Sequence, residues 1–193
     1  MALINFAIFA SGEGSNLQRF IDEVRSGSFP ATLALVVSDR PGCRAVERAR
    51  LAGIDVFAFD PTSFADKAAY ERAILGEVQC RAVRWVVLAG YMRLLGPTLL
   101  EQYRGHIVNV HPSLLPQFAG KDAIGQALRA GVSRTGVTVH FVDEGIDTGP
   151  VIAQAPVNIV PGDTAEKLGE RIHAVEHVLY PAVVRSLLSS VEP

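Results

Sequence analysis

Short apolar runs alternate with segments of helical periodicity along most of this chain. The apolar runs, such as "WVVLAG" at 85–90, hold few polar residues and do not alternate, which is typical of strands buried on both faces. Strands separated by helices predict a parallel sheet with right-handed crossovers. Gly53 is expected to stop the second helix, and Ser63 is a candidate N-cap of the third. We expect strands at 4–10, 32–38, 55–59, 85–90 and 106–110, and helices at 15–27, 43–53 and 63–80.

The pattern changes in the last third of the chain, where apolar and polar residues alternate. The segments at 135–144 and 150–159, joined by a short glycine-containing link, predict an antiparallel pair at the edge of the sheet. A closing helix is expected at 164–190, interrupted or bent near Pro181. The elements together predict one α/β domain over residues 1–193. Its sheet is single, open, mostly parallel and twisted, with an antiparallel C-terminal part and a long closing helix.

Charge and cysteine content narrow the class of partner. The formal net charge is −2, without a long run of one sign, which argues against a nucleic-acid-binding surface and for a small-molecule protein. Cys43 and Cys80 are too few for a disulfide framework and lack metal-ligand spacing, so we expect a reducing cytoplasm and no metal. No apolar run reaches the roughly 18 residues of a membrane helix, and the N-terminus lacks the basic leader of a signal peptide.

The segment "SGEGSNLQ", at 11–18, lies between the first expected strand and the first expected helix. In an open α/β sheet, ligands bind at this position. Gly12 and Gly14 allow close approach of the backbone, and the first N–H groups of the helix favour an anion. Ser15 and Asn16 can add side-chain donors. The third glycine of the dinucleotide fingerprint and the GK[ST] of a Walker loop are both missing, so the pattern favours a phosphate monoester. The alternative is a plain tight turn with Ser15 as its N-cap.

An amide and an imidazole lie two residues apart at the end of the fifth expected strand, in "HIVNVHPSLLP". Because strand side chains alternate, Asn109 and His111 point to the same face. Histidine can pass a proton near neutral pH, and a primary amide can donate to a developing oxyanion. Asp147 is a candidate to orient the imidazole, but Asp143 and Glu144 compete with it. The alternative is a structural histidine with a capping asparagine and solvated acids in a turn.

These segments together resemble the phosphoribosylglycinamide formyltransferases, also called glycinamide ribonucleotide transformylases, of purine biosynthesis. The resemblance covers nearly the whole chain and is carried by "SGEGSNLQ" at 11–18, "ERARLAGI" at 47–54, "VVLAGYMRLL" at 86–95, "NVHPSLLPQFAG" at 109–120, "TGVTVHFVDEGIDTGPVI" at 135–152 and "EHVLYP" at 176–181. It implies a Rossmann-like formyltransferase fold. It also implies transfer of a formyl group from 10-formyltetrahydrofolate to the amine of glycinamide ribonucleotide, with no metal and no nicotinamide. The implied partners are these two small molecules, without nucleic acid or membrane; monomer and homodimer both stay open.

The resemblance also implies roles for the residues that match the family's motifs. Asn109, His111 and Asp147 match the catalytic trio, in which the amide and the protonated imidazole stabilise an oxyanion and the carboxylate holds the imidazole. Residues that match the ribonucleotide site are Gly12, Gly14, Ser15, Asn16, His173 and Glu176. Residues that match the formyl-donor site are Lys67, Leu88, Met92, Arg93, Leu94, Leu95, Asn109, Asp143, Glu144 and Asp147. Residues 1–100 would form the ribonucleotide-binding half of the domain, and residues 101–193 the folate-binding and catalytic half.

Some positions depart from the family pattern. Lys67 stands where an arginine is common and lacks the fork that grips a carboxylate at two points, so affinity for the folate's glutamate tail is expected to differ. Ile124 takes the place of a histidine that often precedes "QAL", and Asp122 is unusual. The loop after Gly120 is therefore expected to hold substrate differently.

Three other functions fit part of the pattern. A methionyl-tRNA transformylase shares "HPSLLP" but needs a basic C-terminal domain, for which this chain is expected to have no room. A formyltetrahydrofolate hydrolase shares the trio but generally has an added N-terminal regulatory domain, whereas the first strand is expected at residue 4. A non-catalytic phosphate-binding protein could keep the glycine loop but has no need of Asn109, His111 and Asp147 together.

Overall fold

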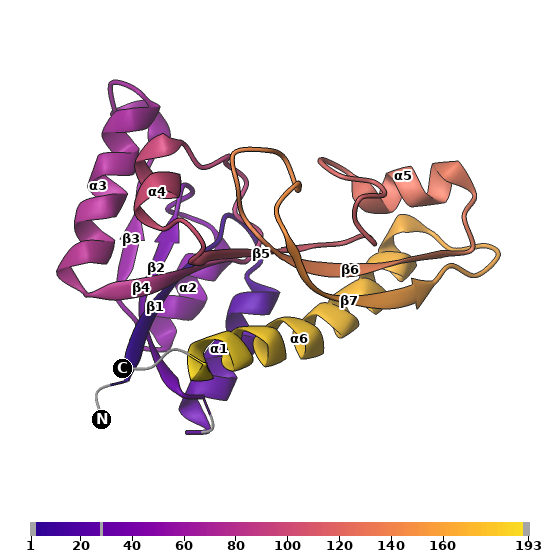
Figure 1. Cartoon of the computed structure of the whole chain (residues 1–193), viewed down its shortest axis with the longest axis horizontal. Helices are drawn as coiled ribbons and strands as arrows, with labels where there is room; N and C mark the ends of the chain where they lie inside the picture. The colour runs from indigo at the N-terminus through magenta and orange to yellow at the C-terminus, as the bar shows by residue number, and fades with distance from the viewer. Residues whose placement is uncertain (1–2, 28, 191–193) are drawn as a thin grey trace.

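Seven strands of the computed structural model form one sheet, in the order β3-β2-β1-β4-β5-β6-β7 (Figure 1). The structure describes residues 3–27 and 29–190, and the count refers to these. The strands are β1 Ile4–Phe9, β2 Ala31–Ser38, β3 Val56–Ala58, β4 Val83–Leu88, β5 Ile107–His111, β6 Arg134–Phe141 and β7 Val151–Asn158. The first five are parallel, and β6 and β7 pair antiparallel. The predicted fold class is therefore confirmed.

Helices cover both faces of the sheet. They are α1 Ser15–Arg25, α2 Arg44–Leu51, α3 Lys67–Cys80, α4 Pro97–Gln102, α5 Ala123–Ala130 and α6 Ala165–Ser189, with a short 3-10 helix η1 Pro61–Ser63. Phe6 and Ile8 of β1 pack in the core with α1, α2 and α6, whereas Ala7 and Phe9 pack with α3 and α4 on the opposite face. Figure 1 shows α3 and α4 on one side of the sheet and α1 and α6 on the other. Burial on both faces explains why these strands are apolar without alternation.

A ligand crevice is expected where β1 and β4 lie side by side, because the strand order reverses there. At their carboxyl ends, the Ser11 N–H donates to the Gly90 carbonyl, and the Ala89 N–H donates to the Phe9 carbonyl. The glycine loop after β1 therefore lies against the segment that follows β4, although the two are far apart in the sequence.

The predicted start of the third helix is wrong. Ser63 does not cap α3, because a separate turn begins at Pro61 and ends at Ser63. Asp66 is the N-cap of α3, and its carboxylate accepts the Ala69 N–H at 2.7 Å. A side-chain acceptor for a first-turn N–H is what selects a helix start, and here the aspartate meets that need.

The predicted interruption near Pro181 is also wrong, because α6 runs unbroken through that residue. Proline removes one helical N–H, so tertiary contacts must hold this turn. The neighbouring Tyr180 is fully buried, and its hydroxyl donates toward the carbonyls of Leu88 and Val108, each at 2.9 Å. These contacts tie the middle of α6 to β4 and β5.

The sequence patterns above do not predict α4 and α5. Before α4, the Gly96 N–H donates to the buried carboxylate of Glu71 at 2.6 Å, which attaches the helix to α3. α5 follows Asp122, whose backbone is left-handed with φ 58° and whose carboxylate lies 2.9 Å from Arg129. Helices this short depend on such contacts, because periodicity alone does not stabilise them.

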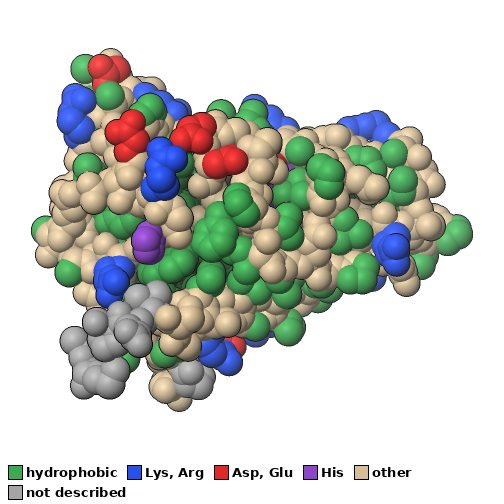
Figure 2. All heavy atoms as spheres, in the orientation of Figure 1, with side chains coloured by type: hydrophobic (Ala, Val, Ile, Leu, Met, Phe, Trp, Pro, Cys, Tyr) green, Lys and Arg blue, Asp and Glu red, His purple; other side chains and the backbone are tan. Residues whose placement is uncertain are grey.

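The surface mixes charges of both signs. Acidic and basic side chains are interspersed on the face drawn in Figure 2. Within residues 3–27 and 29–190, no helix is both long and apolar enough to cross a membrane. In the same described part of the chain, no group of three His, Cys, Asp or Glu side chains is arranged to hold a metal ion. Cys43 and Cys80 are free thiols.

Candidate active site

The antiparallel pairing of β5 with β6 gathers four polar side chains at the carboxyl end of β5. In this register Asn109 lies opposite His140, with 3.2 Å between Asn109 Nδ2 and His140 Nε2. The loop after β6 brings Asp147 Oδ2 within 3.2 Å of His111 Nδ1 and Asp147 Oδ1 within 3.5 Å of His140 Nε2. One amide, two imidazoles and one carboxylate therefore form a single cluster.

Both ring nitrogens of His111 face oxygen acceptors. Nε2 lies 2.9 Å from the Phe118 carbonyl oxygen, and Nδ1 faces Asp147. His111 is only 5% exposed, so bulk water does not compete strongly for these contacts. An acceptor at each nitrogen suits the doubly protonated imidazolium, which has two N–H groups to donate. The cluster can therefore present a positive charge beside the Asn109 amide.

Of the three loop acids that the sequence left open, Asp147 is the one beside His111. Asp143 instead accepts hydrogen bonds from two groups of its own turn. Glu144 is 71% exposed at its side chain and lies 3.4 Å from Arg104. The choice among the acids is therefore made by the conformation of the β6–β7 loop.

Asp147 is held in its ionised form. Burial raises the pKa of its carboxyl group, but hydrogen bonds from His140 and from the Gly120 N–H, with the charge of His111, outweigh burial and hold the pKa below its ordinary 3.8. The backbone of Asp147 is left-handed, with φ 56°, and so is that of Phe118, whose carbonyl faces His111. Such strain costs roughly 1–3 kcal/mol per residue and concentrates at functional sites. Here it orients both acceptors of His111.

His140 is a residue of this cluster that the sequence analysis missed. It is 2% exposed, its Nδ1 lies 2.8 Å from the Phe141 carbonyl oxygen, and its Nε2 faces both Asn109 and Asp147. The alternating pattern at 135–144 could have indicated such a residue, because an antiparallel partner of β5 must place one side chain opposite Asn109. Which side chain that is depends on the register.

The first turn of α1 is open to a ligand. Gly14 is the N-cap with φ 73°, and a Cβ added there would lie 2.8 Å from the Ala45 Cα, so this position requires glycine. The alternative of Ser15 as N-cap is wrong, because Ser15 is the first helical residue and no described side chain caps the helix. Around Gly12, an added Cβ would meet nothing within 4 Å. The first-turn N–H groups are thus available to an anion.

A buried amide and a buried carboxyl group meet behind this turn. Asn16 Nδ2 donates to Glu176 Oε2 at 2.8 Å, and the two residues are 9% and 5% exposed. Asn16 Oδ1 is buried without a hydrogen-bond partner among the described residues. Burial raises the pKa of Glu176, and the Asn16 hydrogen bond and the charges of His173 and His111 only partly oppose that rise. The pair can accept hydrogen bonds from hydroxyl groups of a ligand that lies within electrostatic reach of His111.

Replacing Glu176 with glutamine is expected to reduce the pH dependence of stability. Because the folded-state pKa of Glu176 is raised above its ordinary 4.5, the native protein binds this proton more tightly than the unfolded chain does. Wild-type stability therefore falls as the pH rises from the ordinary value through the raised one. Glutamine keeps the acceptor for Asn16 but does not titrate.

The melting temperature of Glu176→Gln minus that of the wild type should therefore increase between about pH 4 and about pH 8. Thermal unfolding followed by circular dichroism measures this difference. A difference that stays constant over the range would contradict a raised pKa at Glu176.

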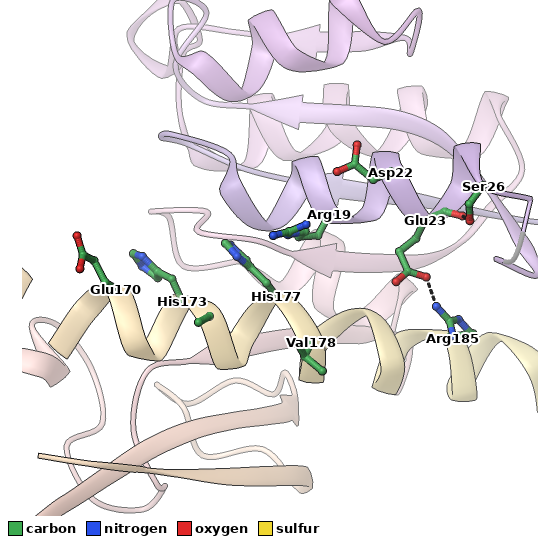
Figure 3. A pocket seen from close by; sticks show the side chains of 10 residues that line it. Arg19, Asp22, Glu23, Ser26, Glu170, His173, His177, Val178 and Arg185 are labelled. Atoms are coloured by element: carbon green, nitrogen blue, oxygen red, sulfur yellow. Dashed lines mark hydrogen bonds and ion pairs between the residues drawn. The ribbon is translucent and has the colours of Figure 1, made fainter. Parts of the chain in front are cut away.

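A groove of about 770 Å³ runs between α1 and α6 (Figure 3). Arg19 points into it from α1, and His173 and His177 point into it from α6, with their rings stacked at a centroid distance of 6.3 Å. Burial, Arg19 and His173 lower the pKa of His177 below its ordinary 6.5. Acidic side chains also line the groove: Asp22, Glu23 and Glu170. His173 thus lies in an open groove of mixed charge, one helical turn from the buried Glu176.

The apolar residues that match the donor site differ in exposure. Leu88, at the end of β4, is 7% exposed and belongs to the core. Leu95 packs partly buried against the same core. Met92 and Leu94 are 66% and 62% exposed, and so offer apolar surface to a ligand beyond the carboxyl end of β4.

The two cations that match the donor site are held by buried acids. Lys67 Nζ lies 3.8 Å from Glu71 Oε1, and Arg93 Nε lies 3.0 Å from Asp39 Oδ2. The cationic side chains are 46% and 42% exposed, whereas the carboxylate side chains of Glu71 and Asp39 are 2% and 4% exposed. Each acid therefore fixes the inner side of a cation whose outer side remains available to an anionic ligand.

Comparisons with known proteins agree with this geometry. The model of the family described as "Formyl transferase" matches residues 4–184. A phosphoribosylglycinamide formyltransferase from Bacillus subtilis (strain 168) is 50% identical over 183 residues, covering 95% of this chain and 94% of that protein. The crystal structure of glycinamide ribonucleotide transformylase 1 from Geobacillus kaustophilus superposes with a TM-score of 0.94 at 59% identity, over 97% of this chain and 100% of that one. A formyltetrahydrofolate deformylase from Pseudomonas syringae pv. tomato is more distant, with a TM-score of 0.88 at 27% identity, over 97% of this chain and 62% of that one.

Proposed function

Since this chain belongs to the formyl transferase family, we propose that it transfers the formyl group of 10-formyltetrahydrofolate to the amine of glycinamide ribonucleotide, in purine biosynthesis. The identity of 50% to a relative named for this activity supports the assignment. The observation that carries it is the cluster of Asn109, buried His111 and Asp147 at the carboxyl end of β5. The residue roles that follow are part of this proposal.

The reaction needs charge stabilisation and one proton transfer. The ribonucleotide amine attacks the formyl carbon, so that a C–N bond forms and the formyl oxygen becomes an oxyanion. We assign the Asn109 amide to that oxygen as a donor, because preorganised donors act where charge develops. The His111 imidazolium stabilises the same oxygen by its charge, and its Nε2–H must leave the Phe118 carbonyl before it can donate there. The bond from the formyl carbon to the folate nitrogen then breaks. The proton lost by the amine passes to that nitrogen, with His111 as the group that moves it.

Asp147 keeps His111 in position and balances its charge. Its lowered pKa means that it stays ionised through the neutral range, so that the imidazolium always has an anionic partner. The same carboxylate faces His140, which in turn faces the Asn109 amide. Asp147 therefore orients both oxyanion donors, one directly and one through His140.

The ribonucleotide is assigned to the first turn of α1 and to α6. Its phosphate would bind the N–H groups after Gly12 and Gly14 together with Ser15, and its ribose hydroxyls would donate to Glu176 and to the unpartnered Asn16 Oδ1. His173 would contribute from the groove beside them.

The formyl donor is assigned to the carboxyl ends of β4 and β5. Met92 and Leu94 offer exposed apolar surface, and Asp143 and Glu144 belong to the same β6–β7 loop as Asp147. Residues 1–100 would mainly bind the ribonucleotide, and residues 101–193 would mainly bind the folate and carry the reacting groups. Two groups of residues are exceptions: the ribonucleotide residues on α6 lie in the second half, and the donor residues after β4 lie in the first half.

Two further assignments belong to this proposal. The partners are the two small-molecule substrates, in a monomer or a homodimer. The location is the cytoplasm, which the free thiols of Cys43 and Cys80 support, because thiols stay reduced in that compartment.

Incubation of the purified protein with glycinamide ribonucleotide and a 10-formyl folate tests the function. We expect the absorbance of the deformylated folate to rise only when both substrates are present. Release of the folate without the ribonucleotide would identify a hydrolase, the activity named for the more distant structural relative. No release in either case would overturn the proposed function.

Replacing Ser15 with aspartate should raise the KM for the ribonucleotide on the order of tenfold to a hundredfold, because a carboxylate would repel the phosphate at close range. The KM for the formyl donor should stay within error of the wild type. Steady-state kinetics with each substrate varied in turn measures both values. Ser133→Asp, on the exposed loop between α5 and β6, is the matched control. An equal rise in both KM values would place the phosphate elsewhere.

A further inference from the structure

A buried carboxylate joins the two substrate segments where the strand order reverses. Asp39 follows β2, and its Oδ1 accepts a hydrogen bond from the Ser11 hydroxyl. The Ser11 oxygen in turn accepts the Met92 N–H at 2.9 Å. Asp39 Oδ2 accepts from Arg93 Nε at 3.0 Å. One carboxylate thus contacts the residue before the glycine loop and the segment after β4.

The burial of this network makes each contact consequential. Ser11 is fully buried and Asp39 is 6% exposed, whereas the Arg93 side chain is 42% exposed. Removing one partner of a buried charge leaves the other unsatisfied, so such contacts hold groups in place more firmly than surface ion pairs do. Arg93 also lies beside Tyr70 of α3, which limits its freedom on that side.

We propose that Asp39 is a positioning residue for the formyl donor, an inference that rests on the proposed function. It fixes the Arg93 guanidinium through Oδ2, and it fixes the Met92 backbone through Oδ1 and Ser11. Ser11 immediately precedes Gly12. The same carboxylate therefore holds the donor-binding segment at a fixed position relative to the phosphate-binding turn. In this proposal Asp39 acts through Arg93 and Ser11 and is assigned no direct contact with either substrate.

The variant Asp39→Asn separates the contact with Arg93 from the contact with Ser11. The asparagine Oδ1 can still accept from Ser11, but its NH₂ group now faces Arg93 Nε, and two donors do not bond. We expect the KM for the formyl donor to rise about tenfold or more, since hydrogen bonds to charged groups are the strong class. The kcat and the KM for the ribonucleotide should stay within about threefold of the wild type.

A double-mutant cycle with Arg93→Ala tests whether Asp39 acts through Arg93. The donor KM of Asp39→Asn/Arg93→Ala should equal that of Arg93→Ala alone. Additive effects of the two substitutions would overturn the proposal, and so would an unchanged donor KM in Asp39→Asn. Asp55→Asn is the matched control, because Asp55 makes the same kind of contact, with Arg81 Nε at 3.1 Å, but lies before β3, at the opposite end of the strands from Asp39. It should leave both KM values unchanged.

Ser11→Ala provides a second variant if Asp39→Asn does not fold. It removes the acceptor of the Met92 N–H and leaves the pair of Asp39 with Arg93 in place. A rise in the donor KM at constant kcat supports the proposal, and a lowered melting temperature with an unchanged donor KM overturns it. Wild-type protein in the same assay distinguishes failure of the proposed function from failure of the inference about Asp39. A wild type without turnover contradicts the proposed function, whereas an active wild type with an insensitive Asp39→Asn contradicts this inference alone.

Discussion

Asp147→Asn is expected to lower kcat by about 10²- to 10⁴-fold while both substrates still bind. Asp147 contacts His111 and His140 through separate oxygens, so one substitution disturbs both imidazoles of the cluster. An asparagine amide facing His111 Nδ1 would donate where the carboxylate accepts, and would favour a neutral ring in the wrong tautomer. Loss of an orienting carboxylate beside a catalytic histidine lowers kcat by about 10⁴ in serine proteases, which sets the upper end of the range.

The matched control for this experiment is Asp143→Asn, in the same loop. Asp143 closes its own turn and does not contact His111, so the proposal assigns it at most a role in donor binding. Steady-state kinetics and thermal unfolding of both variants provide the comparison. If Asp147→Asn turned over within tenfold of the wild type with both substrates saturating, the carboxylate would have no part in the chemistry.

His111→Ala should lower kcat by about 10²- to 10³-fold, the usual effect of removing one oxyanion donor. The substitution also removes the group assigned to move the proton, so the loss should appear in kcat more than in either KM. His111 is buried and contacts Asp147 and the Phe118 carbonyl, which makes a structural role the competing explanation.

Two measurements separate catalysis from structure in His111→Ala. The melting temperature and the dissociation constants of both substrates report on folding and binding, and single-turnover kinetics reports on the transfer step. His106→Ala removes an exposed imidazole just before β5 whose ring packs against Trp85 at a centroid distance of 4.9 Å. It should lower the melting temperature but leave both dissociation constants and the transfer step unchanged. A His111→Ala protein that keeps wild-type turnover would remove the imidazole from the mechanism.

The fold could be predicted because its signals are local. Runs such as 4–10 and 32–38 are apolar at successive positions, and a strand with that pattern must be covered on both faces. Where prediction was wrong, at Ser63 and Pro181, a neighbouring group decided the outcome. Asp66 offered a better acceptor than Ser63, and the contacts of Tyr180 held the turn that proline weakens.

In the candidate site too, some features follow from local sequence and others only from the folded chain. The shared face of Asn109 and His111 follows from the two-residue period of one strand, and the need for glycine at position 14 follows from a tight turn before a helix. Local periodicity reaches only a few residues along the chain, so it contains no information about which distant residues meet. The choice of Asp147, the presence of His140 opposite Asn109 and the link through Asp39 depend on strand register, on loop conformation and on strand order. Those are set by the pairing of segments far apart in sequence, which only the folded chain specifies.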